Sequence, residues 1–267
     1  MTATAERFEF PGAGGSALAA RLDRPRGRPR GVGLFAHCFT CSKDLAAASA
    51  IAGALTEQGI AVLRFDFTGL GSSEGEFANT DFSSNVADLV AAADHLRDHH
   101  EAPRLLVGHS LGGAAVLAAA PKIEEATAVA TIGAPSDPGH VEHLLGEATS
   151  RIEETGEAEV VLAGRSFRVR REFLDDIRSS ALLPAVGGLG RALMVFHAPG
   201  DELVGIDNAR RIFDAAKHPK SYVSLDDADH LLTRRADARY VGRVLGAWAA
   251  RYVVDGVGID AAPSDRR

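Results

Sequence analysis

The chain lacks an excess of positive charge and any long apolar segment. Over 267 residues, 29 Lys and Arg stand against 36 Asp and Glu, which gives a net charge of −7 at pH 7. Because nucleic-acid binding depends on a basic surface, this balance argues against a nucleic-acid partner. Without a run of ~18 apolar residues we expect no membrane span. The first residues also lack the apolar core of a secretory signal, which favours a cytoplasmic location.

What the chain does contain is ordinary for one large globular domain. Its apolar fraction is 46% and its charged fraction 24%, and a chain of this length can bury a sizeable core. The most informative segment is residues 108–112, Gly-His-Ser-Leu-Gly, a G-x-S-x-G pattern. An apolar run precedes it and an alanine-rich run follows it, so the pattern predicts a strand, a sharp turn that exposes Ser110, and a helix. The sequence therefore predicts a nucleophilic serine at position 110.

Short apolar runs alternate with helix-like segments along most of the chain. The runs predict buried strands, and the segments between them have apolar residues at helical spacing. This alternation is typical of a mostly parallel sheet with helices on both faces, whose ligands bind at the carboxyl ends of the strands. The expected strands are 32–36, 60–66, 104–107, 126–132, 192–196 and 222–225, and the expected helices are 44–58, 82–100, 206–216 and 236–252.

Residues 137–190 interrupt this alternation. They read as a polar helix over 142–154, a hairpin within 159–170 and a further helix. Because ~50 residues with their own secondary structure are too many for an ordinary loop, we interpret the segment as a cap over the site. The alternative is a surface decoration. The predicted organisation is thus a core of residues 1–136 and 191–255, a cap of residues 137–190, and a flexible tail of residues 256–267.

A serine hydroxyl becomes a strong nucleophile only when a neighbouring base takes its proton. Among ten histidines, His230 is the candidate because it follows the expected strand 222–225, at the end of the sheet where a base is needed. The acid that orients the base is expected at Asp201, which follows strand 192–196. Asp137, after strand 126–132, is the alternative acid.

An oxyanion hole needs two backbone N–H groups, one from the residue after the nucleophile and one from the loop after an earlier strand. Leu111 supplies the first, and Phe39, in the loop after strand 32–36, is expected to supply the second. The same loop holds the chain's two cysteines, Cys38 and Cys41. Two cysteines are too few for a zinc site, so we expect two reduced residues in a packed loop; the alternative is a redox-sensitive pair.

Taken together, these motifs resemble those of α/β-hydrolases. The resemblance rests on His37-Cys38-Phe39, on residues 66–73, on the Ser110 segment, and on Asp201 and His230. More narrowly, residues 37–44 and 226–232 resemble the hydrolase half of bacterial proteins in which an α/β-hydrolase is fused to an OsmC-like domain. The resemblance implies a serine hydrolase, with an α/β-hydrolase fold and a small cap insertion.

The leading hypothesis is a carboxylic-ester hydrolase that acts on a small molecule through Ser110, His230 and Asp201 and an acyl-enzyme. A thioesterase or acyltransferase would use the same three residues, and a non-catalytic binding protein could keep the fold. We expect no cofactor, because the glycines near residue 70 lack the third glycine of a dinucleotide motif, and no metal site. The sequence carries no signal for the oligomeric state.

Overall fold

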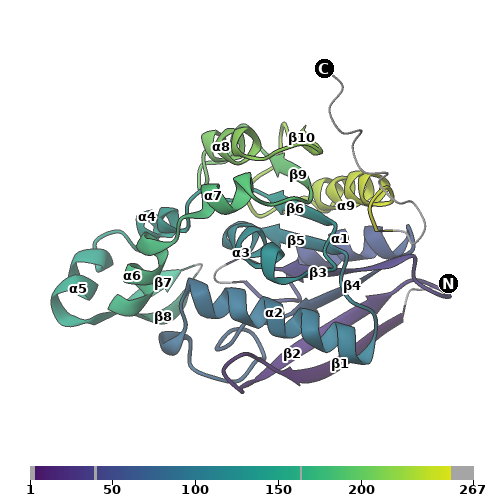
Figure 1. Cartoon of the computed structure of the whole chain (residues 1–267). Coiled ribbons are helices and arrows are strands. Elements are labelled where there is room, and N and C mark those ends of the chain that lie inside the picture. Colours follow the sequence, from purple (N-terminus) through teal and green to yellow (C-terminus); the bar gives the residue numbers. More distant parts are fainter. Residues whose placement is uncertain (1–3, 39–40, 163, 254–267) are drawn as a thin grey trace.

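An eight-stranded sheet runs through the centre of the molecule (Figure 1). The computed structural model describes residues 4–38, 41–162 and 164–253. The strand order is β1-β2-β4-β3-β5-β6-β9-β10; β2 pairs antiparallel with both β1 and β4, and the remaining pairs are parallel. The strands are β1 (Thr4–Pro11), β2 (Ala17–Arg24), β3 (Gly31–Ala36), β4 (Ile60–Phe65), β5 (Leu105–His109), β6 (Ala128–Ile132), β9 (Ala192–His197) and β10 (Lys220–Ser224).

The central strands are apolar because both faces of the sheet are covered. All residues of β3, β4, β5, β6 and β9 are buried, as expected for parallel strands between two helix layers. Leu34 of β3, for example, lies between Leu63 of β4 and Leu106 of β5 in the sheet register. The sheet is therefore the rigid frame from which the site loops extend.

Helices on the two faces of the sheet complete two separate hydrophobic clusters. One cluster contains residues of α1 and α9, and the other contains residues of α2, α3 and α8 together with the insertion. The bounds are α1 (Ala46–Thr56), α2 (Phe82–His99), α3 (Leu111–Ala119), α8 (Asp207–Ala215) and α9 (Arg235–Ala249), with short 3-10 turns η1 (Phe77–Asn79) and η2 (Ala120–Lys122). The arrangement predicted from the sequence, a mostly parallel sheet flanked by helices, is confirmed.

Most of the segment between β6 and β9, from α4 to α6, forms the left-hand part of Figure 1. The single polar helix expected over residues 142–154 is wrong: two helices replace it, because Gly146 takes a φ of +54° and ends the first one. The elements are η3 (Pro138–Val141), α4 (Glu142–Leu145), α5 (Ala148–Thr155), β7 (Glu157–Leu162), β8 (Arg165–Arg170), α6 (Arg171–Ser179) and α7 (Leu182–Gly187), with β7 and β8 paired as an antiparallel hairpin.

Several side-chain contacts join this insertion to the core. The rings of Phe167 on β8 and Phe77 on η1 lie 4.9 Å apart. The carboxylate of Asp176 on α6 accepts hydrogen bonds from the backbone N–H and the hydroxyl of Ser83, in the first turn of α2. The insertion is therefore seated on the start of α2.

The sequence also predicted that no segment spans a membrane and that residues 256–267 form a flexible tail. Among the helices that the structure describes, none has the length and apolar character needed to cross a membrane. The tail predicted for residues 256–267 lies outside the described residues.

Candidate active site

Ser110 occupies the turn between β5 and α3. Its φ of 56° and ψ of −127° lie in a backbone region that side-chain-bearing residues rarely adopt. The turn is held by hydrogen bonds from the Ser110 N–H to the Ile132 carbonyl and from the Gly113 N–H to the Ser110 carbonyl, each 2.8 Å long. The strained turn brings the serine side chain to the carboxyl edge of the sheet.

The glycines that flank the serine are required by close backbone packing. A Cβ atom on Gly108 would lie 2.2 Å from the Gly112 carbonyl oxygen, and one on Gly112 would lie 2.4 Å from the His37 carbonyl oxygen. No other residue fits at these distances without movement of the backbone. The G-x-S-x-G pattern is thus a packing requirement of the strand–turn–helix unit.

His230 lies between Ser110 and Asp201. Its Nε2 is 2.9 Å from Ser110 Oγ, and its Nδ1 is 2.7 Å from Asp201 Oδ2. A carboxylate can only accept, so Nδ1 carries the ring proton, and Nε2 is free to accept the hydroxyl proton of Ser110. The structure brings together the three residues that the sequence nominated, although 120 positions separate serine from histidine.

Asp201 is held as an anion. Burial by itself raises the pKa of its carboxyl, but hydrogen bonds from His230 and from the backbone of Val204 and Leu203 outweigh burial and lower that pKa below its usual value. The two backbone amides donate to Oδ1 at 2.9 and 3.0 Å, which leaves Oδ2 for the histidine. The alternative acid, Asp137, accepts a hydrogen bond from the Gly139 backbone at the start of η3.

Of the two expected oxyanion donors, Leu111 and Phe39, the structure describes Leu111. Leu111 is the first residue of α3, directly after Ser110, so its N–H belongs to the unpaired first turn of that helix. Phe39 lies outside the described residues. Among the described residues near it, Lys43 is anchored by Asp66.

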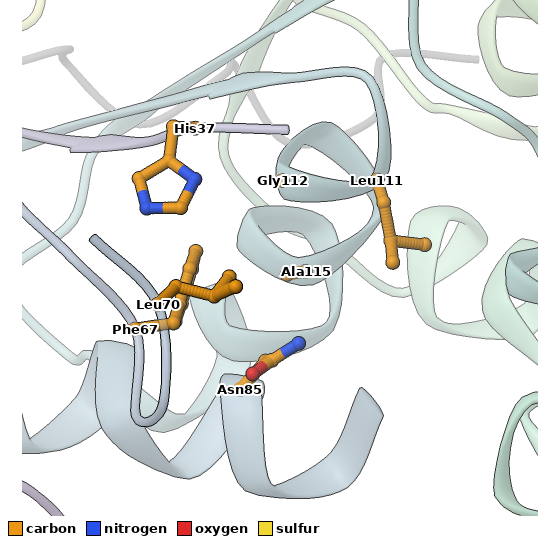
Figure 2. Close-up of a pocket in the computed structure, with 7 residues that line it drawn as sticks. All are labelled: His37, Phe67, Leu70, Asn85, Leu111, Gly112 and Ala115. Carbon is orange, nitrogen blue, oxygen red and sulfur yellow. The ribbon is translucent and has the colours of Figure 1, made fainter. Parts of the chain in front are cut away.

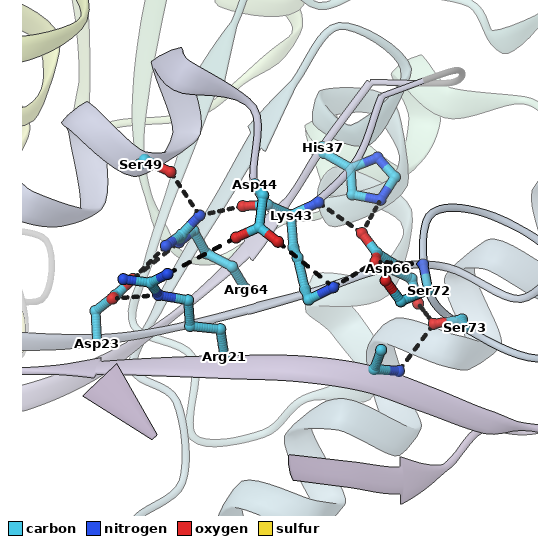
Figure 3. Close-up of polar contacts among 11 residues, drawn as sticks. Arg21, Asp23, His37, Lys43, Asp44, Ser49, Arg64, Asp66, Ser72 and Ser73 are labelled. Carbon is cyan, nitrogen blue, oxygen red and sulfur yellow. Dashed lines mark hydrogen bonds and ion pairs between the residues drawn. The ribbon is translucent and has the colours of Figure 1, made fainter. Parts of the chain in front are cut away.

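A buried carboxylate anchors this loop (Figure 3). Asp66 is fully buried; it accepts hydrogen bonds from the backbone N–H and the Nζ of Lys43, both at 2.6 Å, and from the Ser72 N–H at 2.9 Å. On the other side of the gap, His37 Nδ1 lies 2.8 Å from the Cys38 carbonyl oxygen. One aspartate therefore ties the loop after β3 to the loop after β4.

Cys38 and Cys41 are joined by a disulfide bond. The expectation of two reduced cysteines is therefore wrong for this structure. The physical reason is a tight turn: the Cys41 N–H donates to the Cys38 carbonyl, and the two Cα atoms lie 5.2 Å apart, within the range that a disulfide can bridge.

A small cavity lies beside the start of α3 (Figure 2). Its volume of about 10 Å³ has room for one water molecule. The ring of His37 points toward Phe67 and Leu70 there, and its Nε2, 3.8 Å from Asp66 Oδ1, has no hydrogen-bond partner among the described residues. Burial lowers the pKa of His37, so the ring is neutral. The lining residues are His37, Phe67, Leu70, Asn85, Leu111, Gly112 and Ala115.

Two further histidines beside the site were missed by the sequence reasoning. They are His109 and His197. In the structure, His109 Nε2 lies 2.7 Å from the His230 carbonyl oxygen, and His197 Nε2 lies 2.7 Å from the Val204 carbonyl oxygen. Their position in the sequence could have identified them, because each is the last residue of a strand that leads into the site.

Within residues 4–38, 41–162 and 164–253, no group of three or more His, Cys, Asp or Glu side chains is arranged to hold a metal ion.

Comparison with known proteins places the chain in a family. Residues 27–141 match the family model described as serine aminopeptidase, S33. The crystal structure of an esterase domain from a Rhodothermus marinus protein is 52% identical, covers 93% of this chain and 99% of that one, and superposes with a TM-score of 0.78. The chain belongs to the α/β-hydrolase superfamily.

More distant members of the superfamily agree in fold. Est1E from Butyrivibrio proteoclasticus, solved with ferulic acid bound, has a TM-score of 0.80 at 20% identity and covers 92% of this chain and 98% of that one. Among curated proteins, the mouse mitochondrial palmitoyl-protein thioesterase ABHD10 is 28% identical over 186 residues. That alignment spans 67% of this chain and 62% of the mouse protein. The family model and the Rhodothermus esterase domain support a hydrolase, whereas Est1E supports the fold alone.

Proposed function

We propose that this α/β-hydrolase cleaves carboxylic esters through a Ser110-His230-Asp201 triad and an acyl-enzyme intermediate. The observation that carries the proposal is the continuous hydrogen-bond chain, with 2.9 Å from Ser110 Oγ to His230 Nε2 and 2.7 Å from His230 Nδ1 to Asp201 Oδ2. The likeness to the Rhodothermus esterase domain supports it.

In the first half of the reaction, Ser110 Oγ attacks the ester carbonyl carbon as its proton passes to His230 Nε2. Asp201, already an anion, stabilises the imidazolium that forms. When the tetrahedral intermediate collapses, the carbon–oxygen bond to the alcohol breaks, and His230 returns the proton to the leaving alkoxide. Water then repeats the sequence on the acyl-enzyme and releases the acid.

The tetrahedral intermediate carries a negative oxygen that needs fixed donors. In this proposal the N–H of Leu111 supplies one and the N–H of Phe39 the other. The position of Leu111 at the first turn of α3 supports its part, since a helix start favours negative charge. Removing one such donor typically costs about 10²–10³ in rate.

The test is hydrolysis of a short-chain aryl ester by wild type and by Ser110→Ala. We expect Ser110→Ala to lose turnover and labelling by a fluorophosphonate probe, while Ser221→Ala, on β10, keeps both. Near wild-type turnover by Ser110→Ala would refute the nucleophile. Failure of wild type to react with the probe would favour a non-catalytic binding protein of this fold.

A thioester is the second candidate substrate, because the mouse relative is described as a palmitoyl-protein thioesterase. The same triad serves both reactions, and only the leaving group differs. Matched substrates with one acyl group and either an oxygen or a sulfur leaving group separate the two, and an added alcohol or thiol acceptor reveals acyl transfer.

Four sequence predictions belong to the same proposal. The insertion of residues 137–190 acts as a cap, supported by its contacts to η1 and α2. The kinship with the hydrolase half of OsmC-like fusion proteins is supported by the likeness to a structure described as an esterase domain. A cytoplasmic location and a small-molecule ester as the partner stay predictions of the sequence.

A further inference from the structure

Three neighbouring strands of the sheet end directly beneath the Asp201–His230 pair. They are β5, β6 and β9, which lie side by side in the sheet and end at His109, Ile132 and His197. Gly133, with a φ of +56°, follows Ile132; a Cβ atom there would lie 3.3 Å from both Asp201 Oδ2 and His230 Nδ1. The middle strand end thus lies against the pair itself, with a buried histidine on each side.

The histidine of β5 holds the loop that carries the base. His109 is 2% exposed, and its Nε2 lies 2.7 Å from the His230 backbone carbonyl oxygen. Their rings lie 5.2 Å apart between centroids. A carbonyl oxygen only accepts, so His109 Nε2 carries a proton and donates it. The bond connects the residue before the nucleophile to the backbone of the base.

The histidine of β9 holds the turn that carries the acid. His197 is 1% exposed, and its Nε2 donates to the Val204 carbonyl at 2.7 Å. The N–H of the same Val204 donates to Asp201 Oδ1 at 2.9 Å. His197 Nδ1 is buried with no partner among the described residues, so a proton there would be unsatisfied and the ring is neutral.

From this geometry we infer that His109 and His197 are positioning residues, whose neutral Nε2–H groups fix His230 and Asp201 for the reaction. The inference rests on the proposed function, since it assigns work to residues around that triad. Neither ring touches the substrate's reacting atoms in this assignment; each donates to a backbone carbonyl, and His197 Nε2 also lies 3.7 Å from Asp201 Oδ2. The principle is geometric, because a shift of about 1 Å in a reacting group can cost 10²-fold in rate.

The decisive variants keep or remove the donor at similar volume. Glutamine at position 109 or 197 places an amide N–H near the place of Nε2, whereas leucine fills the space without a donor. We expect His109→Leu and His197→Leu to lower kcat by roughly 10- to 100-fold with little change in KM. His109→Gln and His197→Gln should recover most of that loss, within about threefold of wild type. Equal losses in the leucine and glutamine variants would overturn the inference, as would a rise in KM alone.

A measurement on the unmodified protein keeps the inference testable if the leucine variants do not fold. Nitrogen-15 NMR of histidine-labelled wild type should show His109 and His197 as Nε2–H tautomers at neutral pH. An Nδ1–H tautomer at either position would overturn its role. If wild type is active and the His109 and His197 variants keep its kcat, only this inference is contradicted. If wild type turns over neither esters nor thioesters, the proposed function is contradicted.

Discussion

Lys43 Nζ lies 2.6 Å from Asp66 Oδ2 in the interior of the protein, where the aspartate has no solvent exposure and the lysine side chain has 8%. A buried ion pair costs much desolvation free energy, and its value lies in the geometry it enforces. Here it fixes the loop between β3 and α1 against the loop after β4. The loop expected to hold an oxyanion donor is thereby anchored at its far end.

Breaking this pair should destabilise the fold strongly. We expect Lys43→Met to lower the free energy of unfolding by about 3–5 kcal/mol, because it leaves Asp66 buried and uncompensated. Denaturant unfolding measures the change. Arg97→Ala, which removes a partly exposed pair with Glu125, is the control and should cost at most about 1 kcal/mol. Equal effects at the two sites would contradict the assignment of Lys43–Asp66 as a structural clamp.

Asp201→Asn should abolish most turnover while the protein stays folded. An asparagine amide can replace the hydrogen bond but not the negative charge, and it favours the wrong histidine tautomer. The expected loss in kcat is about 10⁴-fold, the size seen when this change is made in a triad of this kind. Aryl-ester kinetics give the value. The matched control is Asp137→Asn, in the alternative acid position; a larger loss there than at Asp201 would reverse the assignment.

Gly108→Ala should disrupt the serine turn. Its Cβ would lie 2.2 Å from the Gly112 carbonyl oxygen, so the backbone must shift, with an expected cost of more than about 2 kcal/mol. Gly53→Ala, in α1 with no atom within 4 Å of the new Cβ, should be stabilising by up to about 1 kcal/mol. Thermal unfolding of both variants checks the contrast, and a neutral Gly108→Ala would show that the turn is more tolerant than its packing implies.

Stability should fall as the pH drops below about 6.5. Burial, followed by the nearby His230, lowers the pKa of His109 to about 4, and burial also lowers the pKa of His37 and His197. The unfolded chain then binds more protons than the folded one between pH 6.5 and 4. Across this window His109 alone should remove about 3 kcal/mol. Urea unfolding at pH 7 and 4.5 measures the difference in unfolding free energy between the two pH values. His109→Gln should reduce this difference, and an unchanged difference would show that His109 does not cause the loss of stability.

A thiol reductant should lower ester turnover. The Cys38–Cys41 bridge links the residues on either side of the expected oxyanion donor, and Lys43 beyond it is held by Asp66, so we expect that opening the bridge loosens the segment between them. The measurement is kcat before and after reduction. The double variant Cys38→Ser/Cys41→Ser should be insensitive to reductant, and wild type that is equally insensitive would show that the bridge has no influence on the reaction.

The sequence predicted what depends on local pattern. Apolar runs located the buried strands, and the order of serine, acid and base along the chain nominated Ser110, Asp201 and His230 because each follows such a run. The roles of His109 and His197 were beyond this reasoning, since both act on carbonyl groups that any residue possesses. Only the three-dimensional path of the chain shows which carbonyl lies opposite the ring.

Two other differences from the sequence predictions have local causes. The pairing of Cys38 with Cys41 depends on a hydrogen bond from the Cys41 N–H to the Cys38 carbonyl, which the residue types do not predict. The division of the helix expected over 142–154 depends on one glycine, Gly146, which takes a positive φ. The periodicity of apolar residues predicts that this segment is helical and polar. It does not predict the break at Gly146, because a single glycine can lie within one helix or between two.

Because 120 positions separate Ser110 from His230, formation of the site can be used to follow the folding of the chain. Such non-local contacts close large loops and form late, after the strands that separate them have joined the sheet. A chain that has built β3, β4 and β5 already holds its serine, yet it has no base until β9 and the loop after β10 are in place. Recovery of ester turnover during refolding therefore times the last step of assembly, while circular dichroism reports the earlier ones.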